Sequence, residues 1–316
     1  MRITTRMIWS MWAGVVVLVA VTYARIPPAE LYHVSRSGLA GGLGRALVYL
    51  DFPMALVAAL LLAVTYHSLT WRWKRPLAII SLILCVTVAI PGMVDEDNLD
   101  ARLINVLPAL GVGIALMLTW SSPWVGARVT RAGLALATCL AVVSLPWIAA
   151  ETGFSLPRGL FMTSDLVHEP GEIGLVPAVH LGDHHGLGSA LLILTALAVW
   201  ATPRGLPRTV GRRVTQAFAA LLLAYGVVNM VQDFWGEQIA DRGWTDWSIP
   251  DASVPEATLI WGIILIAAAA VYWLPHGDSA GWGASGVSDQ SSSSGISLTK
   301  SISRSTAPTS SGRSSA

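Results

Sequence analysis

Long apolar runs, separated by short polar segments, are the main feature of the chain and predict membrane-spanning helices. A spanning helix needs about 20 apolar residues to cross roughly 30 Å of hydrocarbon. Backbone groups must satisfy one another in lipid, so helices are the only spanning form that this pattern allows. We therefore predict an all-α integral membrane protein, a helical bundle of about eight transmembrane helices. The expected spans are residues 7–24, 46–66, 77–94, 103–120, 132–150, 176–200, 214–232 and 258–274.

The chain changes character after the last apolar run. Residues 275–316 are rich in Ser, Gly and Thr and almost free of large apolar side chains, so they cannot bury a core. We expect a transmembrane domain over residues 1–274 and a disordered Ser-rich tail over residues 275–316.

Two segments four spans apart resemble each other. Residues 91–102 and 229–242 each contain a Met-Val pair, an Asp shortly after it and then a triplet of Asp, Ala and Arg. A 4+4 parallel repeat of residues 1–120 and 132–274 would explain the match, since an even number of spans preserves orientation. Chance similarity between apolar segments is the alternative.

Composition agrees with a membrane protein and excludes two other classes. The chain is 53% hydrophobic and only 12% charged, whereas soluble domains carry about 25% charged residues. The net charge is +1, and no basic patch is interleaved with aromatic residues, so we expect no nucleic-acid partner. Cys85 and Cys139 both lie inside apolar runs and are interpreted as small core residues.

The distribution of charge predicts the orientation. With the amino terminus in the cytoplasm, fourteen of the twenty Lys and Arg residues fall on the inner side and seventeen of the nineteen acids on the outer side. We expect a multi-pass protein of a cell membrane, such as the bacterial inner membrane, with both termini cytoplasmic. Alternatively, Arg2 and Arg6 begin a cleaved signal peptide, which would leave seven spans.

Polar groups inside spans are costly, so their positions carry information about function. Asp51 is expected about five residues inside the outer end of its span, Asn105 at the start of a span and Asn229 at the end of one. All three lie toward the outer side, whereas the inner halves of the spans are apolar. The sequence thus predicts one outward-facing polar layer, although Asp51 could instead pair with Arg45 and merely anchor a helix end.

The densest group of candidate ligands is the segment 180–186, His-Leu-Gly-Asp-His-His-Gly. A helix starting at Pro177, a favoured first helical residue, would bring His180, Asp183 and His184 to one face and turn His185 about 100° away. This spacing matches the His-x-x-Glu-His pattern of inverted zinc hydrolases, with Asp in place of Glu.

Imidazole and carboxylate groups suit a divalent transition metal such as zinc, and a catalytic zinc site takes three protein ligands. Asp183 would act as a base or orient a histidine, and Asp51 would complete the catalytic pair. Alternatively, the histidines simply occupy a wet interface and respond to pH. The candidate metal ligands are His180, His184, His185, Asp233, His168 and Glu172.

Three functions remain open on this evidence. The first is an outward-facing His/carboxylate site, metal-binding and catalytic on a lipid or periplasmic small molecule. The second is a permease for a small solute or ion, and the third is a non-catalytic assembly or pH-sensing protein. The Gly-rich segment 38–44 lacks the features of a phosphate loop and predicts close helix packing or a re-entrant turn.

Overall fold

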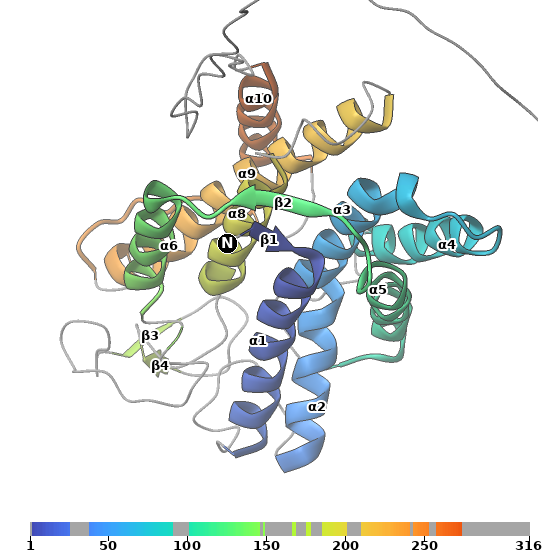
Figure 1. Cartoon of the computed structure of the whole chain (residues 1–316). Helices are drawn as coiled ribbons and strands as arrows, with labels where there is room; N and C mark the ends of the chain where they lie inside the picture. Colours follow the sequence, from blue (N-terminus) through green and yellow to red (C-terminus); the bar gives the residue numbers. More distant parts are fainter. Residues whose placement is uncertain are drawn as a thin grey trace, which may run out of the picture. The chain divides into compact units, whose positions relative to one another are not determined.

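The computed structural model describes residues 2–25, 38–90, 101–145, 148, 166–168, 175–177, 185–200, 210–240, 243–252 and 257–273. All of them belong to one compact unit, Met1–His276, and a second unit comprises Gly277–Ala316. The described residues are predominantly helical, as predicted, and each expected span contains a helix over at least part of its length (Figure 1). The α-helices are α1 (Thr5–Arg25), α2 (Gly38–Tyr49), α3 (Ala55–Thr65), α4 (Lys74–Val86), α5 (Val106–Thr119), α6 (Arg131–Val143), α8 (His185–Trp200), α9 (Val210–Trp235) and α10 (Leu259–Trp273).

Shorter helical turns extend several of these helices. Two are π-helical: η2 (Leu50–Met54) joins α2 to α3, and η7 (Gly236–Ala240) continues α9. Three are 3-10 turns: η3 (Tyr66–Ser68), η4 (Thr87–Ala89) and η5 (Leu103–Asn105). With these turns included, Gly38–Ser68 forms one helical run of 31 residues.

Three helical runs are long and apolar enough to cross a membrane: Thr5–Arg25, Gly38–Ser68 and Gly211–Ala240. The apolar helices Leu103–Thr119, Arg131–Val143, Gly186–Trp200 and Leu259–Trp273 are shorter. The structure therefore supports membrane association by length and composition, and it does not by itself confirm a bundle of eight spans.

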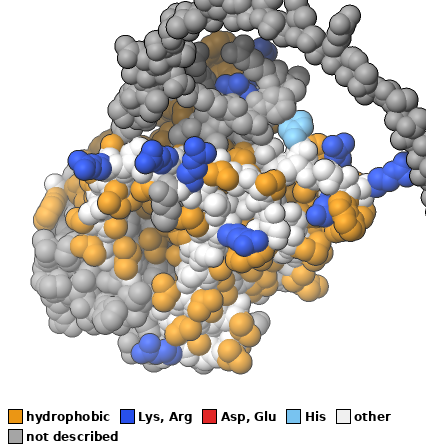
Figure 2. Space-filling model, in the orientation of Figure 1, with side chains coloured by type: hydrophobic (Ala, Val, Ile, Leu, Met, Phe, Trp, Pro, Cys, Tyr) orange, Lys and Arg blue, Asp and Glu red, His pale blue; other side chains and the backbone are white. Residues whose placement is uncertain are grey.

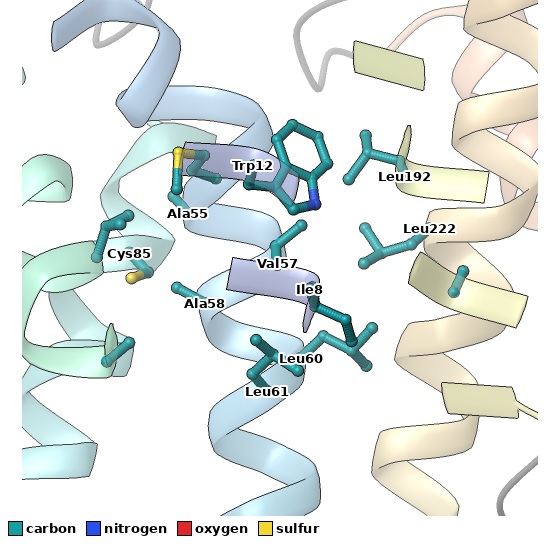
Figure 3. Packing of buried hydrophobic residues seen from close by; sticks show 14 of the residues in the cluster. Ile8, Trp12, Ala55, Val57, Ala58, Leu60, Leu61, Cys85, Leu192 and Leu222 are labelled. Carbon is teal, nitrogen blue, oxygen red and sulfur yellow. The ribbon is translucent and has the colours of Figure 1, made fainter. Parts of the chain in front are cut away.

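The hydrophobic core is built around α3, which is apolar on all its sides. A helix of this kind must be surrounded by other helices, and α3 contacts α4, α5, α8 and α9. Its residues from Val57 to Leu62 are all buried or nearly so, with Leu56 partly exposed just before them. Figure 3 shows side chains of α3 packed beside Trp12 of α1, Leu192 of α8 and Leu222 of α9.

Glycines set the close approach of neighbouring helices at three places. A Cβ on Gly42 of α2 would lie 2.2 Å from the carbonyl oxygen of Ala20 in α1, so the two backbones touch there. Gly111 of α5 faces the backbone of Cys85 in α4, and Gly226 of α9 faces the carbonyl oxygen of Ser189 in α8. Close helix packing, one of the two uses predicted for the segment 38–44, is confirmed.

Two short antiparallel strand pairs were not predicted. β1 (Arg2–Thr4) pairs with β2 (Val125–Arg128), and β3 (Leu166–His168) pairs with β4 (Leu175–Pro177). The first pair joins the start of the chain to the segment between α5 and α6. Two hydrogen bonds lie close to it: Arg6 Nε donates to the Trp120 carbonyl oxygen at 3.1 Å, and Trp9 Nε1 donates to Thr119 Oγ1 at 2.7 Å.

Large apolar side chains also cover much of the surface. On the face shown in Figure 2, hydrophobic side chains lie at the surface between scattered Lys and Arg residues. Ile83 of α4 is 62% exposed and Ile266 of α10 is 72% exposed. Cys139 of α6 is exposed as well, which corrects its interpretation as a core residue, whereas Cys85 is buried as expected. Apolar outer surfaces on helices are typical of contact with lipid.

Replacement of Gly42 tests the contact between α1 and α2. We expect Gly42→Leu to force these helices apart and to lower the free energy of unfolding by about 1–3 kcal/mol, as overpacking does. Thermal unfolding of the detergent-purified protein measures the change. Gly14→Ala in α1 is the matched control, because a Cβ there meets nothing within 4 Å. Equal effects of the two substitutions would contradict the proposed packing.

Candidate functional site

The π-helical turn η2 places a carboxylate inside the helix bundle. The turn contains Asp51 and Pro53, and proline cannot donate the backbone hydrogen bond that a regular helix requires. Insertions of this kind widen a helix locally and are frequent at functional sites. Asp51 is completely buried, so its charge and its oxygen atoms must be satisfied by the protein or by a bound species.

Asn105 is the principal partner of Asp51. Its side-chain nitrogen Nδ2 donates a hydrogen bond to Asp51 Oδ2. The other side of the amide is also held, because the backbone N–H of Arg102 donates to Asn105 Oδ1 at 2.6 Å. This contact fixes the orientation of the amide, so that its NH₂ group faces the carboxylate. The Arg102 side chain itself is exposed.

A second set of polar contacts joins α8 to α9. The backbone N–H of Gly186 donates to Asp233 Oδ2 at 2.9 Å, and Asn229 Nδ2 donates to Ser189 Oγ at 3.0 Å. Gly226 packs against Ser189 and Ile193 one turn further on. Along this series of contacts the residue numbers rise in α8 and fall in α9, so the two helices are antiparallel. Asp233 thus accepts a hydrogen bond from the first turn of α8, where a negative charge is favoured by the helix dipole.

The elements that carry the two sets of contacts pack against each other, η2 against α8 and α9. η2 contacts α8, and the rings of Phe52 and Tyr225 lie 5.6 Å apart in an edge-to-face arrangement. Tyr225 precedes Asn229 by one helical turn, and Phe52 follows Asp51 directly. We call Asp51, Asn105, Ser189 and Asn229 together the polar layer; all four are buried.

The polar layer lies deeper than the sequence predicted. Gly42 faces Ala20 and Ala24 of α1, and Asp51 follows Gly42 by nine residues, about 13 Å of helix. Because α1 and α2 run in opposite directions, Asp51 lies level with the middle of α1, Thr5–Arg25. The prediction that Asp51 lies about five residues from the outer helix end is wrong, because the helix begins at Gly38.

The same correction applies to Asn229. It was expected to end its span, but α9 runs to Trp235 and η7 continues to Ala240. The alternative partner of Asp51, Arg45, is buried and lies over the ring of Tyr23, with its guanidinium carbon 5.5 Å from the ring centroid.

Two oxygen atoms near the polar layer lack a hydrogen-bond donor among the residues that the structure describes. They are Asp51 Oδ1 and Asn229 Oδ1, both fully shielded from solvent. The other polar atom of each side chain is already bonded, to Asn105 and to Ser189. Buried acceptors without a donor are rare in proteins and commonly mark a bound water or ion.

The predicted histidine site is only partly within the described residues. His180, Asp183, His184 and Glu172 lie outside them, as do the side chains of His168 in β3 and His185 in α8. The expected helix start at Pro177 is wrong, since Pro177 belongs to β4 and α8 begins at His185. Within the described part of the chain, no group of three or more His, Cys, Asp and Glu side chains could hold a metal ion.

Asp233 is the one predicted ligand, besides Asp51, whose contacts are described. Its bond to Gly186 places it at the first turn of α8, and its role as a metal ligand stays a prediction. Sequence reasoning missed Ser189. Its position three residues after Gly186, on the same face of α8, was the available signal.

Comparisons with family models, with curated proteins and with solved structures find no match for this chain. The function must therefore be argued from the polar layer and its surroundings.

Substitution of Asp233 tests its role at the start of α8. We expect Asp233→Ala to lower the free energy of unfolding by about 1–3 kcal/mol, because the Gly186 N–H loses its partner in a buried place. Chemical denaturation in detergent measures the loss. Asp246→Ala, which removes an exposed acid, should have little effect, and a comparable loss in that control would argue against a specific contact.

Proposed function

We propose that this protein is a multi-pass membrane permease for a small solute or ion, with the polar layer as its binding site. The observation that carries the proposal is the burial of Asp51 in a π-helical turn, level with the middle of α1. Ionisable residues inside a membrane are costly and commonly mark the path of a substrate or ion. Transporters bind their substrates near the midplane, at interrupted helices.

The depth of the layer also follows from contacts at the opposite end of α1. Arg6 bonds to Trp120, and β1 pairs with β2 nearby; both segments are predicted to be cytoplasmic, and Trp is typical of the membrane interface. Because Gly42 faces Ala20 and Ala24, Asp51 lies level with a point on α1 about five to nine residues from Arg6, roughly 8–14 Å of helix. In a hydrocarbon layer of about 30 Å this depth is inside the cytoplasmic half and approaches the midplane.

Below the polar layer, the path toward the cytoplasm is filled with apolar side chains. Ala55, Ala58 and Leu61 of α3 are fully buried there, and the Trp12 indole lies among them, donating to Thr195 Oγ1 at 3.2 Å (Figure 3). An apolar constriction of this kind acts as a closed gate in channels and transporters. The arrangement fits a permease that is closed on its inner side.

Access to single cysteines from either side of the membrane tests the permease. In a background with Cys85 and Cys139 replaced by Ala, we expect a charged, membrane-impermeant thiol reagent to label Phe52→Cys from outside. During transport the inner gate must open, so the same reagent applied to inside-out vesicles should label Ala58→Cys. Ile83→Cys, on the exposed apolar surface, is the control that should not react.

Complete protection of Ala58→Cys from the cytoplasmic side, with labelling of Phe52→Cys from outside, would contradict transport. It would indicate a pocket that opens to one side only.

A second candidate function is an outward-facing His/carboxylate site that binds a metal and acts on a lipid or periplasmic small molecule. The observation that favours it is the position of Asp233, whose carboxylate accepts from Gly186 beside the histidine segment. His180 and His184 would supply two ligands and Asp233 a third, with Asp183 as base or orienting group. His185, His168 and Glu172 are further ligand candidates.

Metal content tests this second candidate. We expect the detergent-purified protein to carry about one equivalent of a transition metal, and His180→Ala combined with His184→Ala to lose it. Elemental analysis provides the measurement. His67→Ala, which alters an exposed histidine at the other end of the bundle, is the control that should retain the metal, and an unchanged metal content in the double variant would remove the hypothesis.

A further inference from the structure

We infer that the polar layer binds one monovalent cation, with Asp51 Oδ1 and Asn229 Oδ1 as protein ligands. The inference deepens the proposed permease, on which it rests, by naming the class of ion that would drive transport. Both oxygens are buried and have no donor among the described residues, and both belong to elements in contact through Phe52 and Tyr225.

Hydrogen bonds of the neighbouring atoms hold these two side chains in place. Asn105 donates to Asp51 Oδ2 and is itself held by the backbone of Arg102, so the carboxylate cannot turn without losing that bond. The Asn229 amide is held in the same way by Ser189. Each side chain therefore keeps one oxygen available, and a positive charge is the species that both oxygens can stabilise.

The charge of the layer selects a monovalent ion. Asp51 is its only carboxylate, and the other members are neutral amides and a hydroxyl, so the layer carries at most one negative charge. Divalent calcium takes six to eight oxygen ligands, several of them carboxylates. The described residues offer no such cluster. Carboxylate and carbonyl oxygens are hard ligands that bind hard cations, and a single negative charge balances one monovalent cation such as Na⁺.

The guanidinium group of Arg102 does not take the place of the proposed cation. The Arg102 side chain is exposed, and water and salt screen the attraction of an exposed cation for a buried carboxylate. Arg45 is the other cation close in sequence, and it lies over the Tyr23 ring. Neither residue donates to Asn229 Oδ1, which has no donor among the described residues.

Ion-dependent thermal stability tests the site. The full chain is purified in detergent and melted in NaCl, LiCl or KCl, with choline chloride replacing each salt at constant ionic strength. A ligand that binds only the folded protein raises Tm in a saturable way, by roughly 5 °C at about 100 times its Kd. We expect saturable stabilisation by Na⁺ and an apparent affinity at least about tenfold weaker in Asp51→Asn.

Two further variants keep the result interpretable if Asp51→Asn folds poorly. Asn229→Asp adds a second carboxylate and should create a response to Ca²⁺ that the unaltered protein lacks. Thr65→Val is the matched control: it removes a buried hydroxyl on the same helical run, which donates to the Leu61 carbonyl oxygen, and it should leave the Na⁺ response unchanged.

Equal melting of the unaltered protein in all four salts would overturn the ion site. That result leaves the permease standing if Ala58→Cys is still labelled from the cytoplasmic side. Conversely, stabilisation by Na⁺ without such labelling would mean a structural ion and would remove the permease, so the two failures are distinguishable.

Discussion

The hydrogen bond from Asn105 to Asp51 is the contact on which the arrangement of the bundle depends. A carboxylate in the middle of a long helical run is stable only if other helices bring donors to it. Asn105 does so from η5, directly before α5, where a backbone contact from Arg102 orients it. The bond therefore fixes the relative position of α5 and η2, and α3 continues from η2 into the centre of the core.

Hydropathy predicted the existence of the helices well, because burial in lipid or protein imposes long apolar runs that are easily recognised. The errors lie at helix ends. The second span was predicted to begin at residue 46, yet the Gly-rich segment before it already lies in α2, where Gly42 allows contact with α1. Pro177 was interpreted as a helix start, but it pairs in β4. The start of α2 and the pairing of β4 both depend on contacts with distant segments, which one sequence does not reveal.

The sequence identified most residues of the candidate site, but not which of them contact each other. Asp51, Asn105 and Asn229 were recognised because polar groups are costly inside apolar runs, and Asp233 was named as a candidate metal ligand. Their partners follow from the register of antiparallel helices, which is set by side-chain packing. Ser189 escaped notice because a serine in an apolar helix is unremarkable by composition. The depth of the polar layer was underestimated because α2 begins at Gly38 and not at residue 46, where the span was expected to start.

The surroundings of the two halves of the Gly38–Ser68 run differ, and the difference bears on movement. α2 packs chiefly on α1, whereas α3 is enclosed by α4, α5, α8 and α9. Packed interiors resist deformation, while a widened turn is a natural point of bending. A permease built on this plan would therefore hold α3 fixed and bend the helical run at η2. Such a movement would act directly on Asp51, because the carboxylate lies in the turn itself.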